Sequence, residues 1–113
     1  MSITPIPTVG RIVHYTLSES DAEAINRRRD DRIAYQANPY NDERVSKKPT
    51  GFQVHHGNKA HAGDVLPMII VRVWGTQPDS AVNGQVFLDG NDTLWVTSVD
   101  VGDGPRRFAW PTR

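Results

Sequence analysis

The residues of this chain that could do chemistry are few, and the densest group of them is histidine. His55, His56 and His61 precede Asp64 in a glycine-containing stretch. A metal site needs three or four ligands at fixed geometry with hydrogen-bonding support behind them. The spacing of these three histidines and Asp64 does not provide such a set of ligands. We therefore expect a solvated loop that binds neither a metal nor another cofactor. The chain has no cysteine, which excludes disulfides and thiolate chemistry.

Catalytic constellations are missing from the sequence as well. No serine lies in a nucleophile-elbow context, and His14 falls in a predicted strand, so the sequence does not indicate a Ser–His–Asp arrangement. Asp89 and Asp92 are expected to be turn formers. The glycine patterns of dinucleotide and P-loop phosphate sites are absent. We therefore expect a protein that is not an enzyme.

Arg72 is the sole charge inside the apolar run from Val65 to Trp74. A charge in such a run must be paired, hydrogen-bonded or placed at a cavity. The first expectation is a structural ion pair. The alternative is that the planar guanidinium of Arg72 receives a phosphate or carboxylate from a ligand.

Aromatic and arginine side chains supply the other candidate binding residues. Most aromatics are expected in the core, but on an open sheet face Trp95 and Phe87 would form a stacking surface for a base or a protein. Alternation places Trp95 on the same face as Thr97 and Val99. Two arginine clusters could bind phosphates, although solvated faces are the first expectation: Arg27 and Arg28 with their neighbours, and Arg106 with Arg107.

The elements that would position these residues are mostly strands. A first strand is predicted over 8–17, and a helix capped by Ser18 or Ser20 is predicted to run to about Arg32, with Ser18 and Asp21 forming a capping box. Its arginines would then complement the helix dipole at the C-terminal end. A long loop follows over 36–64, with a short strand at 52–54.

The second half of the chain predicts most of the sheet. Residues 65–74 are apolar on both alternating faces, which is typical of a central strand covered on each side. Residues 82–99 predict a β-hairpin around the turn Asp89–Asp92, and a final strand is predicted over 106–110. We expect one mainly β (α+β) domain over 1–113 with an extended lead-in at 1–7. Its fold would be a small SH3-like or OB-like, partly closed antiparallel barrel of five or six strands with one inserted helix.

Charge and hydropathy narrow the possible partners. Thirteen basic and 13 acidic residues give no net charge at neutral pH, so nucleic acid is not an expected partner. The first 15 residues lack the pattern of a signal peptide and no apolar run approaches the length of a membrane span, so we expect a cytoplasmic location without membrane contact.

Three ordered segments resemble a known protein family: PTVGRIVHY at 7–15, GDVLPMIIVRVWG at 63–75, and VNGQVFLDGNDTLWVTSV with GDGPRRFAWP over 82–111. They are similar to short, largely uncharacterised proteins of bacteriophages and prophages. These have a GR-x-VHY start, an LDGNDTLWVTSV hairpin and a WHWP-like C-terminus. Phe108 and Ala109 stand here where the family more often has Trp and His. The resemblance implies a phage origin and a location in the host cytoplasm.

The expected function is that of a non-catalytic binding protein. Such a protein would be an anti-defence accessory that captures a host factor or a small nucleotide-like signal. One alternative is a structural or virion-assembly protein that uses strand edges for contacts. Another is a nucleic-acid-binding OB-like module. A homo-oligomer is expected in each case.

Overall fold

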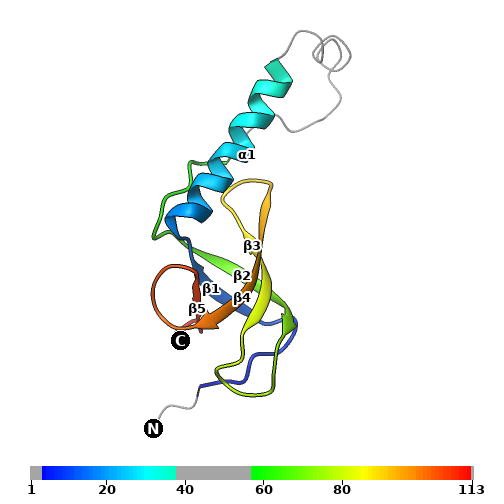
Figure 1. Ribbon diagram of the computed structural model, residues 1–113, viewed down its shortest axis with the longest axis vertical. Coiled ribbons are helices and arrows are strands. Elements are labelled where there is room, and N and C mark those ends of the chain that lie inside the picture. Colours follow the sequence, from blue (N-terminus) through cyan, green and yellow to red (C-terminus); the bar gives the residue numbers. More distant parts are fainter. Residues whose placement is uncertain (1–3, 38–56, 113) are drawn as a thin grey trace.

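The computed structural model describes residues 4–37 and 57–112, which form five strands and one helix. Their order along the chain is β1 (Ile12–Thr16), α1 (Glu19–Ala37), β2 (Val65–Val73), β3 (Val82–Phe87), β4 (Thr93–Val101) and β5 (Arg107–Ala109) (Figure 1). The predicted mainly β domain with one inserted helix is confirmed.

The sheet closes on itself in the order β1-β2-β3-β4-β5. The pairs β1–β2, β2–β3 and β3–β4 are antiparallel, β4 pairs with β5 in parallel, and β5 returns to β1 antiparallel. The predicted small barrel is confirmed, with two differences: it is closed where partial closure was predicted, and one of its five strand pairs is parallel. Each strand neighbours the next one in sequence, so the arrangement lacks the Greek-key crossing of an OB fold.

The barrel interior is filled by alternate side chains of every strand. Most of these side chains are fully buried: Val13, Tyr15, Met68, Ile70, Val82, Val86, Val99 and Phe108. Gly84 also faces inward, because a Cβ atom there would come within 2.5 Å of the Met68 side chain. A closely packed interior of this kind has little space for extra atoms.

Two register shifts flank Asn83 on β3. On β2, the pair Ile70↔Gly84 is followed by Arg72↔Asn83, which leaves Val71 as an extra residue. On β4, the three residue steps from Val96 to Val99 pair with only two steps on β3, from Gly84 to Val82. Ser98, within this part of β4, has a positive φ of 52°. Such a bulge changes which side chains face inward. Val99 consequently joins the core, and the prediction that Trp95 shares its face is wrong.

The helix begins as predicted but runs further. Ser18 Oγ accepts a hydrogen bond from the Asp21 amide at 3.0 Å, and Asp21 Oδ2 accepts one from the Ser18 amide at 3.1 Å, which confirms the capping box. The helix ends at Ala37, five residues beyond Arg32, because the sequence contains neither Gly nor Pro before Pro39. The arginines after Asn26 therefore lie mid-helix, and the dipole argument for them is wrong.

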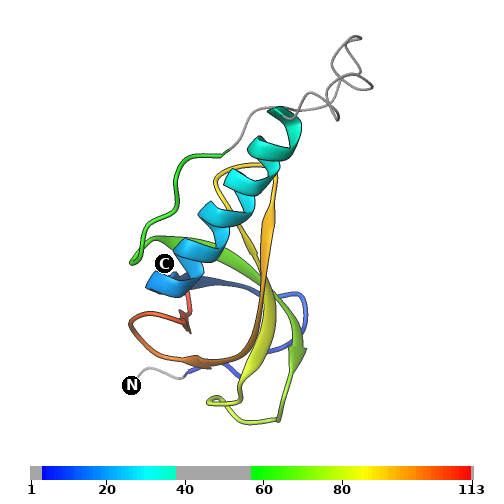
Figure 2. The ribbon, with the colours of Figure 1, turned by 45° about the horizontal axis from the view of Figure 1, so that its top comes forward.

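Helix α1 rises from one end of the barrel, and its C-terminal half extends past the β3–β4 turn (Figures 1 and 2). Ile25 and Ala22 on its first half are buried with Leu17 in the core. From Asp30 to Tyr35 the helix side chains are exposed. Within the described residues, no helix is long and apolar enough to cross a membrane.

The strand boundaries also depart from the sequence prediction. β1 starts at Ile12, because Gly10, with a φ of +94°, forms a turn with Val9. β5 spans only Arg107–Ala109. β2 is not covered on both faces, since Val65 is 57% and Val71 is 43% exposed. The strand predicted at 52–54 lies outside the described residues.

Candidate functional site

The most distinctive surface of the molecule is the outside of β2, β3 and β4. Strand pairing places Ile69 beside Gln85, and Gln85 beside Trp95, in one row across three strands. Directly paired residues point to the same side of a sheet. Trp95 is 61% exposed, and Phe87, two residues beyond Gln85 on β3, is 45% exposed. The open face that would expose both aromatics is therefore present.

Arg72 and Asp100 are the only charged residues on these three strands, and both lie toward the end near the β2–β3 connection. We call the part away from these two charges the outer face and define it by eight uncharged outward residues: Pro67, Ile69, Val71, Gln85, Phe87, Thr93, Trp95 and Thr97. In a chain with 23% charged residues, an uninterrupted uncharged face of this size is distinctive. Exposed apolar patches on small proteins often mark interaction sites, and interface cores are depleted in charged residues.

A buried asparagine organises one end of the outer face, near the β2–β3 connection. Asn83 Oδ1 accepts hydrogen bonds from the Ser98 amide at 2.9 Å and from Trp74 Nε1 at 3.0 Å. Asn83 points outward on β3, yet it is only 9% exposed. The two bulges provide this arrangement, since each introduces its extra residue beside Asn83.

Arg72 completes this end of the outer face. Its guanidinium carbon lies 4.1 Å from the centre of the Trp74 ring, a cation–π contact. Arg72 is exposed, and no described carboxylate forms an ion pair with it. The expected structural ion pair is therefore wrong. The physical reason is that Val71, the extra residue, precedes Arg72 at the end of β2, where its side chain reaches solvent.

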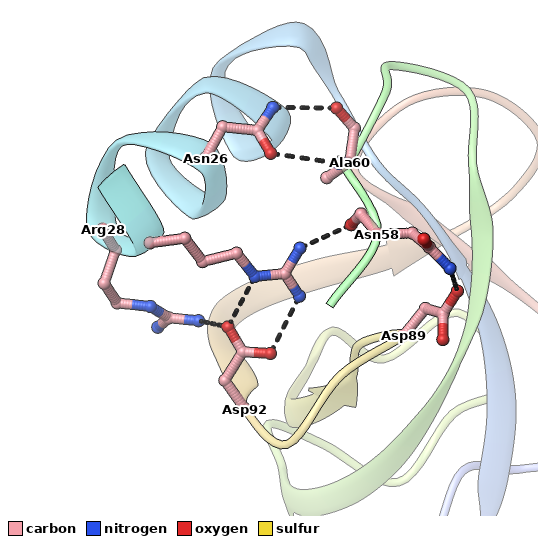
Figure 3. Close-up of polar contacts among 7 residues, drawn as sticks. Asn26, Arg28, Asn58, Ala60, Asp89 and Asp92 are labelled. Carbon is pink, nitrogen blue, oxygen red and sulfur yellow. Dashed lines mark hydrogen bonds and ion pairs between the residues drawn. The ribbon is translucent and has the colours of Figure 1, made fainter. Parts of the chain in front are cut away.

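A separate polar cluster fixes α1 to the barrel (Figure 3). Asp92 accepts hydrogen bonds from Arg29 Nε at 3.0 Å and Nη2 at 2.9 Å, and from the Nη2 of Arg28 at 3.1 Å. The hydrogen bond from Arg29, ahead of its positive charge, lowers the pKa of Asp92, although burial opposes this shift. The same bond raises the pKa of Arg29. Asp92 is therefore more than the turn former that the sequence predicts.

The segment after residue 56 joins the same cluster. Arg29 Nη1 donates to the Asn58 carbonyl at 2.6 Å, and Asn58 Nδ2 donates to Asp89 Oδ2 at 2.7 Å. Asn26 exchanges two hydrogen bonds with the backbone of Ala60, at 2.9 and 3.0 Å. Helix, hairpin turn and connecting segment are thus held together by side chains distant in sequence. The sequence offered no signal for this cluster beyond the residue types.

A cavity of ≈ 270 Å³ lies next to this cluster. Two basic residues, Arg29 and Lys59, and two acidic residues, Asp64 and Asp89, line the cavity. Its apolar lining includes Leu66 and Leu88. These charges cancel, and three of the Arg29 donors are already engaged within the protein. A phosphate group would therefore find no net positive charge there.

The other residues predicted to bind ligands are not brought together. Arg27 and Arg28 are exposed on α1, whereas Arg106 and Arg107 are exposed at the start of β5. His61 Nδ1 lies 4.0 Å from Asp64 Oδ2 on the surface, and the described residues contain no group of three ligands suited to a metal. His55 and His56 lie outside the described residues. Only Arg72, Trp95 and Phe87 share one surface.

Comparison of the chain with models of protein families, with curated proteins and with solved structures found no match. The geometry of the outer face is therefore the main indication of function.

Proposed function

We propose that this protein is a non-catalytic binding protein whose outer face contacts a partner protein. The observation that carries the proposal is the uncharged row of half-buried Ile69, half-buried Gln85 and exposed Trp95, with exposed Phe87 beside it. Aromatic residues are enriched and charged residues depleted at the centres of protein interfaces. Trp95 is the expected anchor, because buried tryptophans dominate binding energies at such surfaces.

The proposed partner is a host protein, and the proposed role is that of a phage accessory protein acting in the host cytoplasm. The resemblance of three segments to phage proteins supports this part of the proposal. A small nucleotide-like ligand is less favoured, because the charges around the cavity beside Arg29 cancel. A nucleic-acid partner is less favoured too, because it requires several phosphate contacts on one face.

A role in virion assembly is the second candidate, and a homo-oligomer would accompany it. Strand edges were the expected contacts for assembly, but all five described strands are paired on both sides in the closed barrel. Closure removes the edges through which strands of different chains would pair. Assembly contacts of the described barrel would therefore also involve the outer face.

The proposal can be tested by photocross-linking in bacterial cells. A benzophenone amino acid replaces Phe87 or Thr97 on the outer face, and replaces Arg27 on α1 as the control. We expect one protein adduct of the same mass from positions 87 and 97 and none from position 27. The same adduct should disappear when Ile69→Lys places a charge on the outer face, with the fold checked by thermal unfolding. No adduct from either position, or an adduct unaffected by Ile69→Lys, would refute the proposal.

A further inference from the structure

Arg72 is held in place before any partner arrives. The Trp74 ring is fixed by its hydrogen bond to Asn83, and the guanidinium of Arg72 stacks on that ring at 4.1 Å. Stacking uses the face of the guanidinium and leaves its N–H groups free around the rim. No described residue accepts a hydrogen bond from these groups. A planar fork with free donors matches the two oxygens of a carboxylate.

Arg72 is the only cation among the residues of β2, β3 and β4. The eight residues that define the outer face are uncharged, so the positive charge offered to a partner lying across it comes from Arg72 at one end, where Asp100 of β4 is exposed as well. Complementarity then requires one negative group on the partner at that end. A nucleic acid carries a phosphate at every nucleotide, and Arg72 could neutralise only one of these charges. A protein segment with a single acidic side chain satisfies the surface better.

The dimensions of the outer face indicate the size of that segment. Three strands spaced by about 4.8 Å, and about six residues at 3.3 Å each, give a surface of roughly 10 by 20 Å. A standard protein interface covers about 800 Å² on each partner, which is several times more. An extended segment of about six residues spans the same 20 Å.

Strand geometry also gives the spacing within the segment. Arg72 pairs with Asn83 on β3, while Trp95 pairs with Gln85, two residues further along β3. Two strand spacings and two residue steps place the Arg72 and Trp95 Cα atoms roughly 12 Å apart, which an extended chain covers in about four residues.

We propose that Arg72 is a specificity-determining carboxylate receptor for an extended, largely apolar segment of the partner. The segment bears an Asp or Glu three or four residues from the apolar side chain that packs on Trp95. This inference rests on the proposed function, because it assigns the chemistry of the partner to the same outer face. It adds that binding depends on one ion pair at a fixed distance from the aromatic anchor.

The test uses peptides selected on the full-length protein from a random library of terminally blocked 12-residue sequences. We expect the selected peptides to share an acidic residue three or four positions from an apolar one. Arg72→Gln in the protein, or Glu→Gln in the peptide, should each weaken binding about ten-fold or more. The two changes together should weaken it no further than either alone. Arg27→Gln is the matched control and should leave the affinity unchanged.

A charge-reversal variant tests whether binding can be restored. Arg72→Glu should lose the selected peptide and regain binding when the acidic residue of the peptide is replaced by Lys. If Arg72→Gln binds like wild type while Trp95→Ser loses binding, the carboxylate receptor is refuted and the proposed function stands. If the library yields no peptide, or none that distinguishes wild type from Trp95→Ser, both the inference and the proposed function are refuted.

Discussion

Arg29 and Asp92 are 63 residues apart in sequence, yet Nε and Nη2 of Arg29 donate to the two carboxylate oxygens of Asp92 at 3.0 and 2.9 Å. The pair connects α1 to the β3–β4 turn (Figure 3). The Arg29 side chain is 9% exposed and that of Asp92 is 21% exposed, so water screens the contact only in part. The β3–β4 hairpin that carries Trp95 is thereby fixed to the helix.

Arg29→Gln should lower the free energy of unfolding by about 2 kcal/mol, because it leaves a largely buried carboxylate with one exposed partner. Arg28→Gln is the matched control, since the Arg28 side chain is 49% exposed while contacting the same carboxylate. The control should cost less than about 0.5 kcal/mol. Urea unfolding of both variants measures the difference, and equal losses would contradict the proposed role of Arg29.

Acid should weaken the same connection. The pKa of Asp92 is lowered in the folded protein, mainly by its hydrogen bond from Arg29. Its stabilising contribution is therefore complete above the unfolded-state pKa of about 3.9 and is lost as the pH falls through the folded-state value. Urea unfolding at pH 6 and pH 3 should show a smaller acid-induced loss in Asp92→Asn than in wild type. The same loss in both proteins would contradict this assignment.

The Tyr15 hydroxyl donates to Asp21 Oδ2 at 2.5 Å, and both residues are buried. Tyr15→Phe removes the donor and leaves a buried carboxylate whose other described side-chain contact is the Ser18 amide. We expect a loss of about 1–3 kcal/mol in the free energy of unfolding. Guanidinium unfolding of Tyr15→Phe and of wild type measures this loss. No measurable loss in Tyr15→Phe would show that water replaces the hydroxyl.

Alkaline pH provides an independent check on Tyr15. Burial, together with the hydrogen bond to Asp21, raises the pKa of Tyr15 well above its usual value. The contribution to stability is complete below the unfolded-state pKa of about 10 and falls as the pH rises beyond it. Stability between pH 9 and pH 11 should therefore decline less steeply in Tyr15→Phe than in wild type. Parallel declines would contradict the assignment.

Asn83→Ala should destabilise the protein by about 1–3 kcal/mol, because the Ser98 amide and Trp74 Nε1 both lose their acceptor. Gln85→Ala, two residues along the same strand, is the control and should stay within about 0.5 kcal/mol of wild type. Thermal unfolding compares the two variants. Tryptophan fluorescence anisotropy should also fall in Asn83→Ala, because the Trp74 ring is released. If neither quantity changes, Asn83 does not organise this end of the outer face.

The sequence predicts correctly those elements that depend on interactions between residues close in the chain. The Ser18–Asp21 capping box and the hairpin turn that includes Asp89 and Asp92 involve neighbouring residues, and both are present. Helix α1 extends five residues beyond its predicted end at Arg32, because basic residues do not by themselves end a helix. A chain without Gly or Pro can continue a helix through them.

Alternation alone failed where the sheet has bulges. When the residues of the apolar run 65–74 are assigned alternately to the two faces of a strand, both faces are apolar, and the run predicts a strand that is buried on both faces. The extra residue Val71 changes the faces beyond it and brings Arg72 to solvent, and the residue pair at 97–98 does the same before Val99. Bulges depend on pairing between strands, which one sequence does not contain. The sequence predicts a common surface for Trp95 and Phe87 on an open face, whereas the position of Arg72 at the end of that face depends on the bulge at Val71.

Binding through the outer face can be measured by isothermal titration calorimetry. The partner protein identified by cross-linking from position 87 is purified and titrated separately into wild type, Trp95→Ser and Arg27→Gln. We expect the Kd for Trp95→Ser to rise at least about ten-fold, because exposed aromatic anchors carry much of the energy of such interfaces. The Kd for Arg27→Gln should equal that of wild type. Equal Kd values for wild type and folded Trp95→Ser would contradict the assignment of the outer face as the binding surface.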